Sequence, residues 1–302
     1  MTLAVFADPT PELSDCRRCP RLAAHLDAIR GEDPRSHNAP VGWYGDPEAR
    51  LLIVGLAPGR SGANRTGIPF TGDDSGDWLW QVLAREGFAD GDVADERAPR
   101  LTDAIITNAV KCLPPGNRPS AAEVASCRAH LAAEMQTFRN VRVIVALGRI
   151  AHDATLAALG APRRGHPFAH GAVHKLESAP LLIDSFHPSP LNTRTGRMTR
   201  AEWRKLWKRA AHLAREQWHV YLLRCGDGTL YTGISNDVAA RLKKHASGKG
   251  ALYTKWRGAV EILWTERATS KSAALSREHA VKKLTRAQKF ALAKLDPQPL
   301  RR

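Results

Sequence analysis

The sequence predicts an α/β fold, a three-layer α/β/α domain with a parallel sheet, followed by a small α+β domain. Over the first two thirds of the chain, apolar runs of strand length alternate with helical patterns, which is typical of a parallel sheet covered by helices. The last third begins instead with two strand-like runs that flank a turn dipeptide. At 302 residues the chain also exceeds what one core usually serves. We therefore expect two domains, residues 1–216 and 217–302.

Four continuous apolar runs define the predicted sheet. They lie at residues 51–56, 104–110, 141–148 and 181–186. Helical patterns at 77–86 and 121–138 lie between them, and a basic helix over 199–217 closes the domain. Open α/β sheets bind their ligands beyond the carboxyl ends of the strands, so the loops after these runs are where a site is expected.

The second domain is predicted to be a β-β-α-β-α-α unit. Asp227-Gly228 favours a type I′ hairpin between its first two strands. Asn236 or Asp237 can cap the helix that follows, residues 260–265 form a third strand, and Thr285 can cap the last helix.

The charge of the chain points to a polyanionic partner. The net charge is +15, and from residue 218 onward 17 Lys and Arg stand against 6 Asp and Glu, a difference of 11. Lys and Arg that neutralise phosphates release condensed counterions, which favours nucleic acid as the partner. A merely solvated basic face and attraction to anionic lipid are the alternatives. No amphipathic membrane helix is evident in the sequence, so nucleic acid is preferred.

The sequence gives no sign of a membrane segment or an export signal. No stretch reaches about 18 apolar residues. The N-terminus has no basic region before its apolar residues and soon meets a proline and acidic residues. We expect a cytoplasmic protein with no membrane partner, in which disulfides are improbable.

Four of the five cysteines form a pattern that suits a metal centre. Cys16 and Cys19 make a Cys-x2-Cys pair, Cys112 lies in a turn-rich run with Cys127 beyond it, and Cys225 stands alone. Four thiolates from two regions suit a structural zinc or an iron–sulfur cluster, and the spacing does not choose between them. Buried, inert cysteines are the alternative.

Two loops after the predicted strands have unusual composition. The loop that begins at Gly55 is dense in glycine and can bring backbone amides close to a phosphate or a nucleobase, although it lacks the Gly-Lys-Ser/Thr ending of a Walker loop. The loop after the last strand runs from His187 to Asn192 and reads HPSPLN.

These loops carry a resemblance to a known family. Residues 51–200 resemble the uracil-DNA glycosylase superfamily. The segments GANRTGIPFTGDDSGD, NAVKCLPPGNRP and HPSPLNT, together with the four cysteines, are similar to its type 5, iron–sulfur branch. The resemblance implies a base excision repair enzyme that acts on DNA containing uracil or other deaminated bases. It also implies a mainly structural 4Fe–4S cluster, whose ligands are Cys16, Cys19, Cys112 and Cys127.

The chemistry of base release can be assigned to side chains in these loops. Phe70 can stack on a flipped base, and Asn108 can present its amide to the Watson–Crick edge. His187 can donate to the carbonyl oxygen that gains charge as the glycosidic bond lengthens. Asp73, with Asp74 as the alternative, can balance charge on the sugar and orient water. The resemblance implies the same roles for Phe70, Asp73, Asn108 and His187.

Two further loop residues, Gly55 and Asn192, are expected to contact the substrate. Each main candidate also has a structural reading: Phe70 as core, Asn108 as a satisfied turn amide, and Asp73 as a helix N-cap.

The loop departs from much of the superfamily at one place. Many members carry an acidic or amide residue there to activate water, whereas this sequence has Leu56 and Ala57 before Pro58. The type 5 branch typically lacks that residue too and often accepts deaminated purines. Gly59-Arg60 replaces the branch's small-residue pair, which leaves the range of bases beyond uracil open.

The last third resembles a second family. Residues 219–290 are similar to the GIY-YIG nuclease superfamily in its small form. Val220-Tyr221-Leu222 stands where Gly-Ile-Tyr stands, and Tyr231-Thr232-Gly233 where Tyr-Ile-Gly stands. Arg241 and His245 are four residues apart and therefore share one helix face.

The resemblance implies phosphodiester cleavage with a divalent metal. A tyrosine, Tyr221 or Tyr231, would serve as the base, Arg241 would grip the phosphate, and His245 would contribute to binding. Glu278 would hold one cation, expected to be Mg²⁺. Two alternatives stay open: a non-catalytic DNA-binding module, and a nuclease that the first domain merely targets. A chain that senses damage without catalysis is a further alternative.

Overall fold

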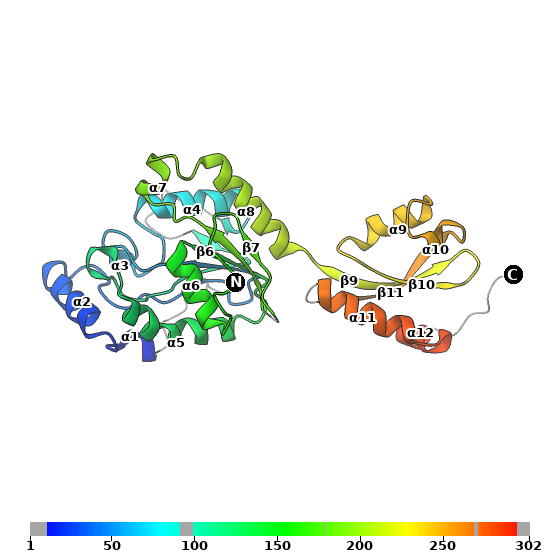
Figure 1. The fold of residues 1–302 in the computed structure, drawn as a ribbon, viewed down its shortest axis with the longest axis horizontal. Coiled ribbons are helices and arrows are strands. Elements are labelled where there is room, and N and C mark those ends of the chain that lie inside the picture. The colour runs from blue at the N-terminus through cyan, green and yellow to red at the C-terminus, as the bar shows by residue number, and fades with distance from the viewer. Residues whose placement is uncertain (1–10, 91–98, 178, 269–270, 295–302) are drawn as a thin grey trace. The chain divides into compact units, whose positions relative to one another are not determined.

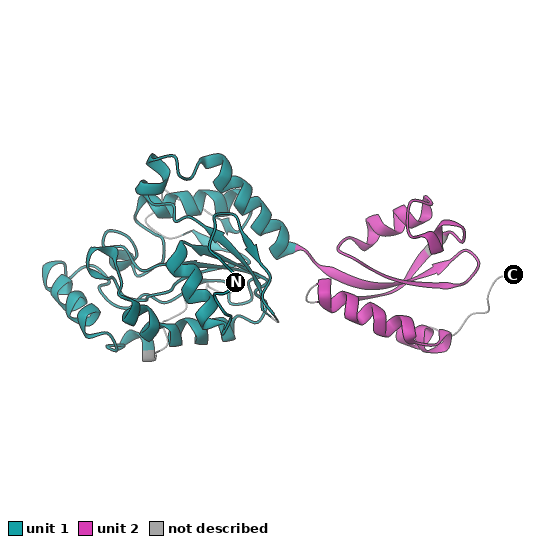
Figure 2. Ribbon diagram, in the orientation of Figure 1, with its two compact units in different colours: residues 1–215 teal, residues 216–302 magenta. Residues whose placement is uncertain are grey.

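The computed structural model describes residues 11–90, 99–177, 179–268 and 271–294 (Figure 1). The chain forms two compact units, residues 1–215 and 216–302 (Figure 2). Their division falls one residue before the domain boundary expected from the sequence. Within the described residues, no helix is long and apolar enough to cross a membrane.

The centre of the first unit is a six-stranded sheet in the order β1-β5-β2-β6-β8-β7. The four inner strands are parallel, which confirms the predicted parallel sheet: β5 (Ala104–Asn108), β2 (Leu51–Gly55), β6 (Val143–Leu147) and β8 (Leu181–Ser185). The edge strands β1 (Tyr44–Gly45) and β7 (Val173–His174) are antiparallel to their neighbours. Both have two residues, too few for a periodic pattern to reveal them.

Helices cover both faces of this sheet, as the three-layer prediction requires. Side chains alternate along β2: Leu51 and Ile53 join a core with α4 (Asp74–Arg85) and α8 (Arg200–Arg215). On the other face, Leu52 and Val54 join a core with residues of α5 (Ala121–Thr137) and α6 (Arg149–Ala158). A strand that is apolar on both faces reads as the continuous run that the sequence shows.

Shorter elements complete the unit. The helices are α1 (Pro11–Ser14), α2 (Pro20–Glu32), α3 (Ala63–Thr66), η1 (Pro115–Asn117) and α7 (Pro190–Arg194). β3 (Ala89–Asp90) pairs with β4 (Arg100–Leu101).

The second unit has a three-stranded antiparallel sheet in the order β10-β9-β11. The strands are β9 (Trp218–Cys225), β10 (Leu230–Ser235) and β11 (Ala259–Ala268). α9 (Val238–Ala246) and α10 (Leu252–Lys255) lie on one face, and α11 (Lys271–Lys283) and α12 (Arg286–Leu292) on the other (Figure 1). This is the predicted α+β unit with α10 added.

Two capping predictions hold and the turn prediction was wrong. The Asp237 side chain accepts the Ala240 N–H at 2.8 Å, and Thr285 caps α12 in a capping box with Gln288. The hairpin is not a type I′ turn, because of its central residues only Gly228 has a positive φ (82°). The Gly228 N–H donates to the Cys225 carbonyl at 2.9 Å, as in a type I turn followed by a glycine bulge.

Candidate active sites and metal centre

A cavity of about 460 Å³ opens beyond the carboxyl ends of β2, β5, β6 and β8. Its size suits a small ligand such as one nucleotide. Four of the predicted residues line it: Phe70, Asp73, Asn108 and His187. Asn108 ends β5 and the other three come from the loops that follow β2 and β8, so the parallel strands bring them together. The lining also includes residues that the sequence did not single out, namely Ser75, Asn117, Leu147, Arg149 and Ile150.

Gly55 is what allows the ring of Phe70 and the amide of Asn108 to meet. A Cβ built on Gly55 would overlap the Asn108 Oδ1 atom and lie 2.6 Å from the Phe70 ring. No rotation of a side chain at residue 55 could relieve this, because Cβ is fixed by the backbone. Gly55 itself is not among the cavity-lining residues, so it shapes the site rather than lining it.

Phe70 is held in a strained conformation. Its φ is +58°, in the left-handed region that residues other than glycine rarely adopt. The Trp80 indole N–H donates to its carbonyl at 2.6 Å, and Gly76 packs against the same carbonyl where any Cβ would clash. The ring is 7% exposed and its centroid lies 5.8 Å from that of His187. Such strain is typical of functional sites held in place by their surroundings.

Asp73 is both a helix cap and a wall of the cavity. Its Oδ1 accepts the Gly76 N–H at 2.9 Å and so caps α4, as its structural reading anticipated. Its Oδ2 lies beside Gly59 and Gly62, whose lack of side chains leaves room for it. Burial raises the pKa of this carboxyl above its ordinary value.

Asn108 and His187 provide a carbonyl and an imidazole. Asn108 is 2% exposed, and its Oδ1 has no hydrogen-bond partner among the residues that the structure describes. A buried acceptor of this kind costs free energy unless a ligand supplies a donor. Burial lowers the pKa of His187 to about 4, so the ring is neutral at neutral pH.

Asn192 does not line the cavity. Its amide donates to the His187 carbonyl at 2.8 Å and lies 3.4 Å from the Ser189 hydroxyl. Asn192 therefore fixes the loop that carries His187.

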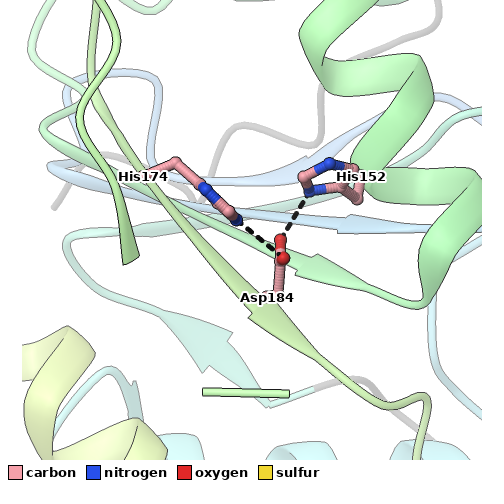
Figure 3. A group of neighbouring side chains, drawn as sticks. All are labelled: His152, His174 and Asp184. Carbon is pink, nitrogen blue, oxygen red and sulfur yellow. Dashed lines mark hydrogen bonds and ion pairs between the residues drawn. The ribbon is translucent and has the colours of Figure 1, made fainter. Parts of the chain in front are cut away.

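A buried His–Asp–His network joins α6, β7 and β8 (Figure 3). Asp184, on β8, is fully buried. His152 Nδ1 and His174 Nε2 lie 2.6 and 2.8 Å from its two carboxylate oxygens. The second ring nitrogen of His152 lies 3.0 Å from the His166 carbonyl, so both ring nitrogens have a polar neighbour.

This network was missed by sequence reasoning. Its three ligand atoms are close enough together for a metal ion, yet their hydrogen bonds to one another already satisfy them. The network connects α6, β7 and β8. Its carboxylate, Asp184, lies three residues before His187. The signal in the sequence was a carboxylate, Asp184, inside an otherwise apolar run, because a buried charge needs partners.

The four predicted cluster cysteines line one small cavity. Cys112 and Cys127 are buried, Cys16 and Cys19 are half-buried, and all four are free thiols. Burial, and then the proximity of the other cysteines, raises the pKa of Cys112 to about 12. Four such sulfurs become stable thiolates only where a cation compensates their charge. The residues therefore fit a metal centre.

The second unit gathers its predicted residues in one place. The Tyr221 hydroxyl and His245 Nε2 lie 3.1 Å apart, and His245 Nδ1 lies 2.5 Å from the Thr254 hydroxyl. The Tyr231 ring lies 5.0 Å from that of His245. A Cβ on Gly233 would lie 3.0 Å from the Tyr231 ring and overlap Tyr221, so glycine is required between the tyrosines.

Arg241 and Glu278 complete this group. Burial raises the pKa of Tyr221 to about 12, whereas hydrogen bonding to Arg241 acts against this rise. The Arg241 Nε is buried and has no hydrogen-bond partner in the described part of the chain, which leaves it able to donate to a ligand. Glu278, whose charge also acts on Tyr221, pairs with Lys282 Nζ at 2.9 Å.

Comparison with known proteins agrees with both halves of this description. The model of the uracil DNA glycosylase superfamily matches residues 43–211, and that of the GIY-YIG catalytic domain matches residues 217–291. The chain therefore belongs to the uracil DNA glycosylase superfamily. Within it, the chain is of the type-5 kind and carries a GIY-YIG domain at its C-terminal end, as its motifs predicted.

The relatives of the first unit are named as type-5 uracil-DNA glycosylases. The protein from Thermus thermophilus is 43% identical over 213 residues, covering 67% of this chain and 95% of the relative. That from Pyrobaculum aerophilum is 39% identical over 212 residues, covering 68% of this chain and 92% of the relative.

The relatives of the second unit carry a family designation only. A UPF0213 protein from Staphylococcus epidermidis is 52% identical over 73 residues, covering 24% of this chain and 89% of the relative. A solution NMR structure of the UPF0213 protein BH0048 from Bacillus halodurans is 46% identical, covers 28% of this chain and 88% of that chain, and has a TM-score of 0.19.

Proposed function

We propose that the first unit hydrolyses the N-glycosidic bond of uracil in DNA. The observation that carries this proposal is the cavity in which Phe70, Asn108, Asp73 and His187 converge. A base can reach such a cavity only after it leaves the helical stack. The names of the relatives support the same activity.

Each group has a task in this reaction. The extruded base stacks on Phe70, and its N3–H donates to the unpartnered Oδ1 of Asn108. When the C1′–N1 bond breaks, its electron pair moves onto the uracil, and the neutral His187 donates to the oxygen that gains charge. Asp73 balances the positive charge on the sugar and orients the water that adds to C1′. The products are free uracil and an abasic site.

The range of bases is proposed to extend to other deaminated bases. Leu56 and Ala57 contribute apolar lining where many family members have a polar residue, so nothing in that wall selects a pyrimidine. Release measured from matched duplexes that contain uracil, hypoxanthine or xanthine tests this point. Release of uracil alone would restrict the proposal to that base.

The pH dependence of uracil release tests the state of His187. Since burial lowers its pKa from 6.5 to about 4, we expect no inflection near pH 6.5 from His187. A fall in rate at lower pH is expected instead from protonation of Asp73, whose pKa burial raises. Single-turnover rates measured between pH 8 and pH 4 give this profile. An inflection near 6.5 that disappears in His187→Gln would contradict the assignment.

We further propose that Cys16, Cys19, Cys112 and Cys127 hold a 4Fe–4S cluster. Among the residues that the structure describes, only His152, His174 and Asp184 place three ligand atoms within 4.8 Å of one another. Sulfurs around one zinc would lie about 3.8 Å apart, since each Zn–S bond is about 2.3 Å long. No three of the four cysteine sulfurs meet this 4.8 Å limit, which supports a multi-iron cluster.

The cluster would have a structural task. It would tie the start of α2 to α5 and to the segment after β5, which directly follows Asn108 and contains Cys112. Iron and acid-labile sulfide in the purified chain are the expected findings. Zinc without iron would overturn this proposal.

For the second unit we propose metal-dependent cleavage of DNA. Arg241 would grip the scissile phosphate, and a tyrosine beside it would take the proton of the attacking water once its own hydroxyl has given up its proton. Glu278 would hold Mg²⁺, which would stabilise the departing oxygen. One carboxylate suffices for a cation that keeps several waters and binds substrate phosphate. The partly buried Glu278 and the buried Nε of Arg241 support this reading.

Glu278→Gln is expected to abolish cutting and leave uracil release unchanged. The amide keeps the shape of the side chain but lacks the charge that attracts a divalent cation. The assay follows labelled uracil-containing duplex with Mg²⁺ and without alkali, so that strand breaks report the second unit alone. Lys271→Gln, at the exposed start of α11, is the control.

The same assay separates the alternatives. Intact abasic strands as the only product would leave the second unit as a DNA-binding module. Cutting that persists in Glu278→Gln would contradict its metal-binding role. The DNA substrate and the free thiols both suit the cytoplasm, which we propose as the compartment.

A further inference from the structure

Helix α10 presents unusually exposed apolar side chains. Trp256, the C-cap of α10, is 81% exposed, and Leu252 and Tyr253 are 77% and 41% exposed. Large apolar side chains that gather on a surface mark interaction sites, since their exposure to water costs free energy. Three such residues within five positions call for a partner.

Cations accompany the aromatic rings on this surface. Lys255 Nζ lies 5.3 Å from the centroid of Trp256, and the Arg257 guanidinium lies 4.3 Å from that of Tyr253. Arg257 is itself held by Asp227 at 3.1 Å. Aromatic faces interleaved with cations suit bases and phosphates together, because rings stack on bases and cations attract the backbone. The charge difference of 11 from residue 218 onward favours the same partner.

The exposed surface is continuous with the candidate nuclease site. Tyr253 stacks on Tyr231, with centroids 5.9 Å apart and planes at 30°. Thr254, which lies on α10 like Tyr253 and is fully buried, contacts His245 of α9. The inner side of α10 therefore belongs to the site, while its outer side faces solvent beside it.

We propose that Trp256, Tyr253 and Leu252 form a stacking platform for unpaired bases of single-stranded DNA next to the nuclease site. In a duplex each base is covered above and below, so only an unpaired base can lie flat on Trp256. This platform implies that the substrate of the second unit is DNA with a single-stranded segment. It rests on the proposed cleavage only for the location of the cut, because binding requires neither metal nor chemistry.

The test is binding of labelled single-stranded oligonucleotides without uracil to the full chain, measured by fluorescence anisotropy in EDTA. Trp256→Ala should weaken binding by about 5- to 150-fold, the range for loss of one base–aromatic stack. Trp256→Phe should retain most of the affinity. Leu275→Ala, 48% exposed on α11 on the opposite face of the sheet, is the matched control and should bind like the unaltered chain.

Two further measurements separate stacking from charge. An oligonucleotide with abasic positions keeps every phosphate but lacks base faces. The unaltered chain should bind this oligonucleotide more weakly than the intact strand. Trp256→Ala should bind the two oligonucleotides equally well. 2-Aminopurine in the strand should be quenched by the unaltered chain and much less by Trp256→Ala, whichever unit dominates total affinity. Lys255→Ala should instead reduce the salt dependence of binding by about one phosphate contact.

The outcomes distinguish this platform from the proposed cleavage. The platform proposal would be overturned if Trp256→Ala and the unaltered chain showed equal affinity and equal 2-aminopurine quenching. It would also be overturned if Trp256→Ala lost affinity for single strands and for duplex DNA to the same extent. If the chain does not cut DNA but Trp256→Ala lowers single-strand binding, the platform stands and the cleavage proposal falls.

Discussion

Replacing Asp73 by Asn is expected to slow uracil release by about 10²- to 10⁴-fold, the usual contribution of a positioned acid or base. The thermal unfolding of the first unit should change little, because Asn caps helices as well as Asp and can keep the bond from the Gly76 N–H. The substitution therefore removes the charge next to the sugar and leaves the helix cap. Single-turnover release and a melting curve on the same preparation measure both effects.

Matched variants sharpen this expectation. Asp73→Ala should lose the activity and about 1 kcal/mol of stability, since it also removes the cap. Asp74→Asn should be nearly as active as the unaltered chain, because the Asp74 side chain is 71% exposed and pairs loosely with Arg194 at 3.8 Å. If Asp74→Asn were inactive and Asp73→Asn active, Asp74 would be the catalytic carboxylate.

Replacing Asp184 by Ala is expected to destabilise the first unit by about 3–5 kcal/mol, because it removes the acceptor of three buried donors and each unsatisfied donor costs about 1–3 kcal/mol. The ring nitrogens of His152 and His174 would lose their buried acceptor, and the Ala169 N–H would lose an acceptor at 3.1 Å. For a unit of this size such a loss lowers the melting temperature by very roughly 6–20 °C.

Asp153 on α6, next to His152 in the sequence, provides the control substitution for Asp184→Ala. Asp153 is 27% exposed and its nearest cation is Arg163 at 3.6 Å. Exposed pairs of this kind contribute at most about 1 kcal/mol, so Asp153→Ala should shift the melting temperature only slightly. Equal shifts for the two variants would contradict a stabilising role of the hydrogen-bond network in Figure 3.

The frame of the fold could be predicted because its signals are local. Strands buried on both faces are continuous apolar runs, and the parallel sheet followed from their alternation with helices. The edge strands β1 and β7 are two residues long and carry no pattern. The turn at Gly228 depends on one residue's φ, which the dipeptide Asp227-Gly228 leaves undetermined.

The site was predictable as a set of residues but not as an arrangement. Phe70, Asn108 and His187 were found from their loops, whereas the strain at Phe70 arises from contacts with Trp80 and Gly76 that no short window reveals. Asn192 was expected to contact the substrate from its place in the loop. Its amide is instead directed to the backbone of His187, which only the folded loop shows.

Gly55 has a consequence for how related chains are read. The difference between a hydrogen atom and a methyl group at this position decides whether the ring and the amide can face one base at all. A homologue could keep every reacting side chain and still be inert if alanine stood there. To judge whether such a chain keeps the activity, the residue at the position of Gly55 must therefore be examined, although it takes no part in the reaction itself.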